Sequence, residues 1–141
     1  MNNLLKIEKI LDFCDVPQLF IARDAFDTMY LCLLYEDNPS CLYTAIKISS
    51  NRLDTFLSGQ IDLRELFENP EVPFEYFDVE YSDNKYTFRP HQDTMVEETR
   101  LPLHGYKMNG NEQENVIVQI PVQDRGLLKE LVRKFGWACV L

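Results

Sequence analysis

The stretch QLFIARDAFDTMYLCLLYEDNPSCLYTAIKI, residues 18–48, decides how this chain folds. Most of its residues fall in three apolar runs of strand length, which are residues 18–23, 28–36 and 41–48. The runs are rich in Leu, Ile, Phe and Tyr, and the connections between them hold Asp, Asn and Pro, which favour turns. Because connections this short join antiparallel neighbours, the stretch predicts an antiparallel meander of strands.

Upstream of this stretch, residues 7–14 can be read in two ways. Leu4, Ile7 and Leu11 have helical spacing, whereas the apolar residues that follow lead straight into a turn before Pro17. A proline pushes the residue before it to an extended conformation. We therefore expect a strand over 7–14 that ends at this turn and joins the meander.

Two short helices are predicted downstream of the meander. The candidate N-caps of the first are Ser49 and Ser50, whose hydroxyls can accept a backbone N–H. The second is predicted to begin at Asp62, with Glu65 three residues on completing an acidic capping box. Their apolar stripes are Leu53, Phe56 and Leu57 in the first helix, and Leu63, Leu66 and Phe67 in the second.

The rest of the chain predicts a second hairpin and a C-terminal helix. Further strands are expected at residues 77–81, 86–88 and 116–122, and a helix is expected to follow Asp124. The predicted fold is a single α+β domain over residues 1–141. It is an antiparallel meander sheet with two short central helices, a second hairpin and a C-terminal helix.

Charge is placed unevenly along the chain. The 141 residues carry a net charge of −9, and residues 62–98 alone hold eleven acidic and three basic residues, a net of −8. An acidic surface repels a phosphate backbone, so general nucleic-acid binding is not expected. We read the stretch in two ways, as a solubilising surface and as a surface that recognises a basic patch on another protein.

Cysteine usage and the missing address signals predict a reducing cytoplasmic location. No window reaches the roughly 18 apolar residues of a membrane span, and the N-terminal residues are broken by charges. The cysteines form no CxxC pair, and three of them lie inside apolar runs. We expect four free thiols at Cys14, Cys32, Cys41 and Cys139.

The candidate protein-binding residues are Asp62, Arg64, Asp78 and Glu80, all within the acidic stretch. Asp78 and Glu80 share one face of a predicted strand, where they form either a solvated face or a contact surface for a basic partner. No pattern of a catalytic, metal-binding or cofactor-binding site is recognisable. The sequence therefore favours a non-enzymatic protein-interaction or regulatory accessory module.

The alternative is a small enzyme or ligand-binding domain. Its site would lie in the irregular region of residues 90–114 and would use His91, Asp93 and His104. Neither histidine has the i, i+4 partner of a helical zinc site. A long irregular segment in a compact domain is either functional or mobile, so this alternative stays open.

One resemblance adds to this interpretation. It rests on Asp15 and Pro17 before an apolar strand, on YLCLL at residues 30–34, and on RLDTFLSGQIDLRELFENPE at residues 52–71. The segment GQIDLR, residues 59–64, is its most specific part. Over residues 11–71 the chain resembles an uncharacterised bacterial family of unknown function. The resemblance implies a bacterial origin and no particular activity.

Overall fold

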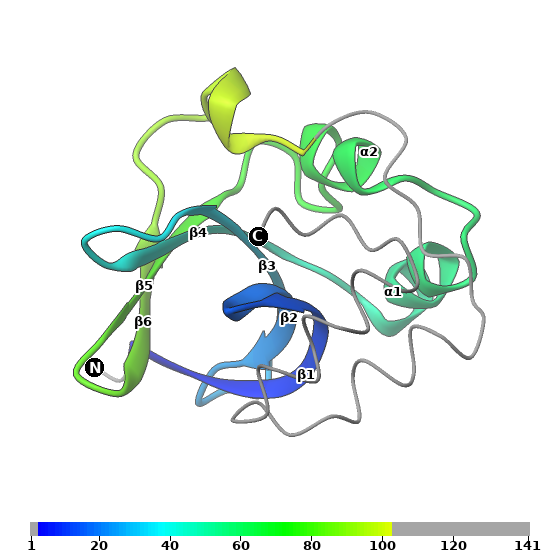
Figure 1. The fold of residues 1–141 in the computed structure, drawn as a ribbon. Coiled ribbons are helices and arrows are strands. Elements are labelled where there is room, and N and C mark those ends of the chain that lie inside the picture. The colour runs from blue at the N-terminus through cyan, green and yellow to red at the C-terminus, as the bar shows by residue number, and fades with distance from the viewer. Residues whose placement is uncertain (1–2, 103–141) are drawn as a thin grey trace.

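Six antiparallel strands close into a barrel in the part of the chain that the structure describes, residues 3–102. The structure is a computed structural model. The elements in chain order are β1 (Leu4–Cys14), β2 (Val16–Arg23), β3 (Met29–Glu36), β4 (Cys41–Lys47), α1 (Ser50–Leu57), α2 (Leu63–Glu68), β5 (Phe77–Ser82), β6 (Lys85–Pro90) and η1 (Glu98–Arg100). Figure 1 looks almost along the barrel, with the strands around a ring and both α-helices on one side.

The predicted open α+β meander is therefore wrong, because the sheet closes and strands dominate the described residues. Closure depends on β1, whose pairing with β2 shifts register between Ile7 and Lys9, between Ile10 and Asp12, and again before Phe13. Such irregularities bend a strand and increase its twist. The start of the bent β1 reaches β6, where Leu4 and Leu5 pair with Thr87 and Tyr86.

The second hairpin belongs to the same sheet as the first four strands. Although two helices separate β4 from β5 in sequence, the two strands are antiparallel neighbours with Tyr43 opposite Val79. The β5–β6 turn holds Asp83 and Asn84 at positive φ, as a two-residue hairpin turn requires. The strands, the turns and the β5–β6 hairpin were thus predicted correctly, whereas the pairing of β5 with β4 and of β6 with β1 was not.

Both helices begin where the caps were predicted. The Ser49 side chain accepts a hydrogen bond from the Arg52 backbone N–H at 3.2 Å, so Ser49 rather than Ser50 is the N-cap of α1. Asp62 accepts the Glu65 backbone N–H at 2.8 Å at the start of α2. These bonds satisfy donors that the first helical turn leaves without intrahelical partners.

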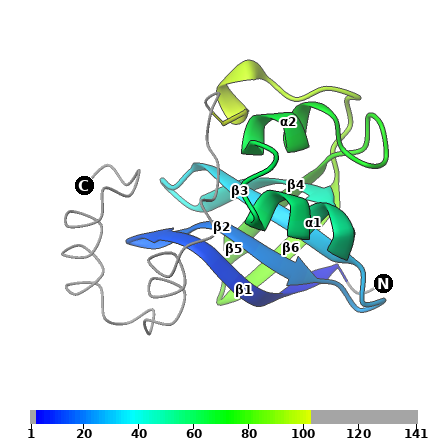
Figure 2. The same cartoon turned by 90° about the vertical axis from the view of Figure 1, so that its right-hand side faces the viewer.

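Two apolar clusters lie on the two faces of the strands. The first fills the barrel, and its aromatic side chains meet across it, with Phe20 and Tyr43 ring centroids 5.0 Å apart. The second lies outside the barrel, where Phe56 of α1 and Phe67 of α2 pack on β2, β3 and β4. Figure 2 shows both helices over the same side of the strands. The helices cover these strands, and the outer face of β5 and β6 is left to polar side chains.

The cysteine prediction fails at one position. Cys32 and Cys41 are free thiols, but Cys14 is disulfide-bonded. Cys139 lies outside the described residues, as do the predicted strand at 116–122 and the predicted C-terminal helix. Among residues 3–102, none of the helices has the length and apolar character needed to cross a membrane.

Candidate functional site

The chain that follows β6 crosses from the barrel to the helices and is fixed to both. We call residues 91–102 the strap; it contains η1. On the barrel side, Arg100 of η1 pairs with Asp78 of β5 at 2.7 Å. On the helix side, Glu98 of η1 pairs with Arg64 of α2 at 2.6 Å, and Arg64 also donates to the Pro102 carbonyl. Two arginine–carboxylate pairs therefore hold the strap in place.

Asp78 is the centre of the barrel-side attachment. Its carboxylate accepts a hydrogen bond from Arg100, and the Nδ1 atom of His91 lies 2.9 Å away. Burial alone would raise the pKa of Asp78, but the hydrogen bonds and charges of Arg100 and His91 outweigh it and lower that pKa. Arg100 also donates to the Thr44 hydroxyl at 3.0 Å and stacks 4.1 Å from the ring centroid of Tyr35. The guanidinium of Arg100 thus joins β3, β4 and β5.

The helix-side attachment is built around Arg64, one of the predicted protein-binding residues. Its side chain is only 9% exposed and lies between Glu68 at 3.3 Å and Glu98 at 2.6 Å. The hydrogen bond with Glu98 is the main reason why the pKa of Arg64 is raised. Arg64 is therefore not available to a partner, whereas the carboxylate of Glu98 is largely exposed.

An apolar groove lies along the helix side of the strap, with a volume of about 570 Å³. Its most exposed apolar side chains are Phe74, at 68%, and Met95, at 73%. Phe74 also has a positive φ of 64°, which is unusual for a bulky residue. Two carboxylates, those of Glu68 and Glu98, stand at this groove. The remaining lining side chains are Asn69, Pro70, Pro73, Tyr76, Thr94, Val96 and Leu101.

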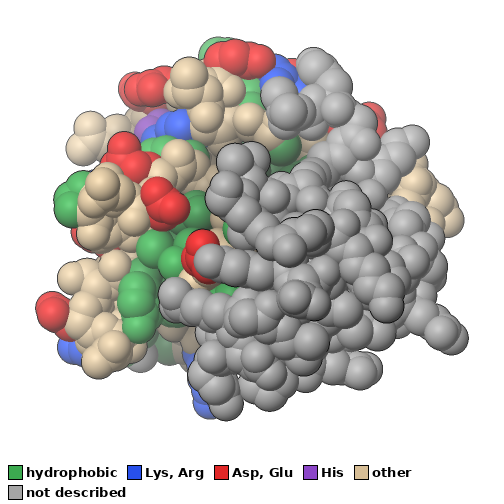
Figure 3. Space-filling model, in the orientation of Figure 1, with side chains coloured by type: hydrophobic (Ala, Val, Ile, Leu, Met, Phe, Trp, Pro, Cys, Tyr) green, Lys and Arg blue, Asp and Glu red, His purple; other side chains and the backbone are tan. Residues whose placement is uncertain are grey.

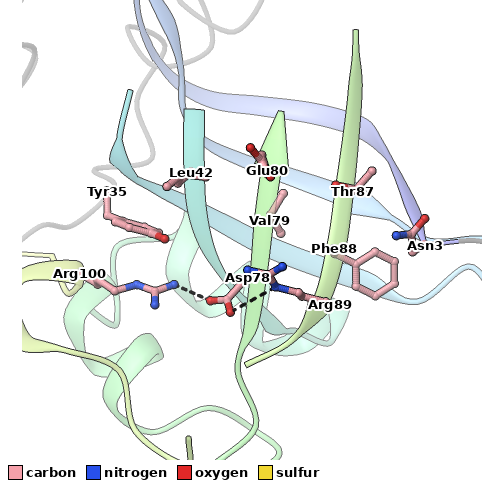
Figure 4. A pocket seen from close by; sticks show the side chains of 10 residues that line it. All are labelled: Asn3, Tyr35, Leu42, Asp78, Val79, Glu80, Thr87, Phe88, Arg89 and Arg100. Carbon is pink, nitrogen blue, oxygen red and sulfur yellow. Dashed lines mark hydrogen bonds and ion pairs between the residues drawn. The ribbon is translucent and has the colours of Figure 1, made fainter. Parts of the chain in front are cut away.

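A second pocket, of about 320 Å³, lies on the barrel side of the strap. It sits on the outer face of strands β3 to β6, and Asp78 and Arg100 form one end of it (Figure 4). Its lining is mostly polar, in contrast to the groove on the helix side. The strap thus separates two pockets of different chemistry.

The four predicted protein-binding residues do not form one surface. Asp62 caps α2, Arg64 is buried under the strap, and Asp78 is held by Arg100. Only Glu80 is an exposed acid, and it accepts a hydrogen bond from the Ser40 hydroxyl at 3.1 Å. Figure 3 shows the face of the molecule that is seen in Figure 1, and on its described part the acidic side chains are dispersed rather than gathered in one patch. Much of the acidic stretch is paired within the protein.

Of the three residues of the alternative site, His91 and Asp93 lie in the part of the chain that the structure describes. His91 contacts Asp78 of the barrel, while Asp93 is an exposed residue of the strap. His104 lies outside the described residues. Within residues 3–102, no group of three or more His, Cys, Asp or Glu side chains is arranged to hold a metal ion.

Apart from Asp78 and Glu80, the residues that shape the two pockets were missed by sequence reasoning. Arg100 and Met95 lie in a region without periodicity, and Tyr35 looked like the end of a buried strand. The one signal that could have found the groove is Phe74, an aromatic residue in a proline-rich connection where no core pattern needs it.

The fold defines a small β-barrel protein with two flanking helices and a strap that forms two pockets. Residues 3–130 match a family described as "Family of unknown function (DUF6575)", and the chain belongs to this family. This confirms the resemblance to an uncharacterised family, over a longer stretch than residues 11–71. The bacterial origin stays a prediction. Comparison with curated proteins and with solved structures gave no match.

Proposed function

We propose that this protein is a non-enzymatic interaction module that binds a partner polypeptide in the apolar groove beside the strap. The partner presents a bulky apolar side chain next to a basic residue. The observation that carries this proposal is the exposure of Phe74 and Met95 at a groove with a carboxylate rim. Contiguous exposed apolar surface rimmed by polar groups is typical of protein-binding sites.

The distribution of exposed apolar side chains supports this choice of surface. Among the described residues, the exposed large hydrophobic side chains are Leu4, Phe26, Val72, Phe74 and Met95. Three of these five belong to residues 72–95, and two of them line the groove. Single exposed apolar residues need no explanation, but a group at one concave site costs solubility unless a partner covers it.

The backbone at Phe74 adds a second argument. A bulky residue at positive φ costs of the order of 1–3 kcal/mol, and such strain gathers at functional sites. In a core residue this cost is offset by burial, yet the side chain of Phe74 is mostly in solvent. The chain therefore keeps an aromatic side chain in an unfavourable and exposed position, as expected for an anchor of an interface.

Charge determines which partner fits the groove. One guanidinium, that of Arg64, faces two carboxylates, Glu68 and Glu98, so this cluster has a net charge of −1. Because Arg64 is buried, a partner meets the carboxylates first. A basic residue beside the inserted apolar side chain complements this rim and speeds association.

The test is a peptide-display selection against the full-length protein, followed by affinity measurements on the enriched peptides. We expect sequences in which a Phe, Leu or Met lies next to Lys or Arg. Phe74→Ser and Met95→Ser are each expected to weaken binding by about thirtyfold or more, the effect of losing one anchor of about 2 kcal/mol. Both side chains are exposed, so these variants should fold normally.

Phe26→Ser is the matched control, because Phe26 is 84% exposed at the β2–β3 turn, away from the groove lining. It should leave binding unchanged. The proposal is wrong if no peptide is enriched, or if enriched peptides bind the Phe74 and Met95 variants as tightly as the unaltered protein.

A further inference from the structure

The polar pocket on the barrel side of the strap is independent of the proposed docking groove. It lies over the outer face of strands β3 to β6, of which β5 and β6 are not covered by the two helices (Figures 1 and 4). Its volume of about 320 Å³ is within the range of small-molecule sites. The question is what kind of molecule its charges would hold.

One end of the pocket carries an excess of positive charge. Arg89 and Arg100 approach the carboxylate of Asp78 from opposite sides, at 3.9 and 2.7 Å (Figure 4). His91 contacts the same carboxylate. A single carboxylate cannot neutralise two guanidinium groups. The contact with Arg89 is loose and its side chain is 81% exposed, so Arg89 can turn to an incoming anion.

The other end of the pocket is negative. In the β5–β6 register Asp78 opposes Arg89, and Glu80 opposes Thr87, so Glu80 and Arg89 are diagonal neighbours on one face. Diagonal neighbours of a sheet lie about 7–8 Å apart. Figure 4 shows Glu80 on the side of the pocket away from the two arginines. The pocket therefore presents separated charges of opposite sign to a ligand.

The pocket also has an apolar wall. The ring of Tyr35 and the side chain of Leu42 line it beside the polar groups. Tyr35 is held in place by the stacked guanidinium of Arg100. Hydrocarbon parts of a ligand would contact these two side chains while its charged groups reach the two ends.

We propose that this pocket binds a small zwitterion of the amino-acid type. The ligand carboxylate pairs with Arg89 at the arginine end, and the ligand ammonium pairs with Glu80. A plain anion is repelled by Glu80 and a plain cation by Arg89, so the separated charges select a molecule that carries both. The apolar wall favours an aliphatic side chain.

The test is a two-dimensional NMR titration of the full-length protein with L-leucine, N-acetyl-L-leucine and L-leucinamide. L-leucine is expected to give saturable shifts at the backbone amides of Glu80, Thr87 and Arg89. Each derivative lacks one of the two charges and should bind about tenfold more weakly, as expected when one charge-assisted hydrogen bond is lost.

Arg89→Gln and Glu80→Gln should each weaken leucine binding by about the same factor, whereas Lys85→Gln, on the same hairpin but outside the pocket, should not. All three side chains are on the exposed part of the hairpin, so folding is preserved. The proposal is overturned if none of the three compounds gives saturable shifts, if the derivatives bind as well as leucine, or if the variants at positions 80 and 89 bind normally.

Discussion

Replacing Arg100 by glutamine should release the strap from the barrel at a cost that the structure allows us to estimate. The change removes two charge-assisted bonds, one to the Asp78 carboxylate and one to the Thr44 hydroxyl, each worth about 1.5–3 kcal/mol. It also removes the stacking on Tyr35, worth about 0.5–2 kcal/mol. Because such terms overlap and water replaces part of them, we expect a net loss of about 2–4 kcal/mol.

The loss should depend on pH in a direction fixed by Asp78. The pKa of Asp78 is lower in the folded protein than in the unfolded chain, where it is about 3.9. The contribution of Asp78 to the free energy of unfolding is therefore complete above the unfolded-state pKa and is lost as the pH falls through the folded-state pKa. Urea denaturation should therefore show the largest difference between Arg100→Gln and the unaltered protein near neutral pH. The difference should shrink as the pH falls below about 4 and through the lowered pKa of Asp78 in the folded protein.

A double-mutant cycle with Asp78→Asn separates this ion pair from the other contacts of Arg100. We expect a coupling free energy of the order of 1–3 kcal/mol at neutral pH. The reasoning about the strap is refuted if Arg100→Gln destabilises by less than about 0.5 kcal/mol, within the range of ordinary surface changes. A loss that is the same at all pH values would refute the assigned role of Asp78.

Three further predictions concern the rest of the molecule. Asp62→Ala should lower the free energy of unfolding by about 0.5–2 kcal/mol in thermal denaturation, because α2 loses its N-cap, whereas Glu97→Ala should not, because the Glu97 side chain makes no capping bond. Equal effects of the two changes would contradict the role of Asp62 as an N-cap. Phe56→Ala should cost about 3–5 kcal/mol in urea denaturation, because this side chain is fully buried between α1 and the barrel; a cost below about 1 kcal/mol would show that α1 does not pack there. Cys32 should resist alkylation in the native protein, since burial raises its pKa and blocks access, while Cys41 should react faster in mass-spectrometric labelling; equal rates would contradict the described barrel interior.

Local sequence signals predicted the strands, turns and helix caps, but the closure of the sheet depends on contacts that they do not contain. The alternation of Phe77, Val79 and Tyr81 predicts a strand but does not say that it pairs with β4 across two helices. The bends in β1 have no sequence marker, because neither glycine nor proline occurs in it. The closure of the sheet into a barrel could therefore not be predicted from the sequence.

The candidate pockets were harder to predict, because side chains rather than a backbone pattern hold the strap. Asp78 meets Arg100 after 22 residues and Arg64 meets Glu98 after 34. Neither spacing corresponds to the period of a helix or a strand, so no sequence pattern indicates these two ion pairs. The acidic stretch was recognised, but four of its eleven acidic residues, Glu68, Glu75, Asp78 and Glu98, turned out to form ion pairs within the protein.

The barrel closes between β1 and β6 through few paired positions, so this is the weakest strand pairing of the barrel. In the described part of the chain the two strands pair at two positions, Leu4–Thr87 and Leu5–Tyr86, with one more bond from the Phe88 N–H to the Asn3 carbonyl. Residues 3–5 therefore act as a latch. If they detach, β1 and β6 each have an unpaired edge, and the aromatic side chains inside the barrel next to Tyr86 become exposed to water. Unpaired, apolar strand edges allow strands of separate molecules to pair.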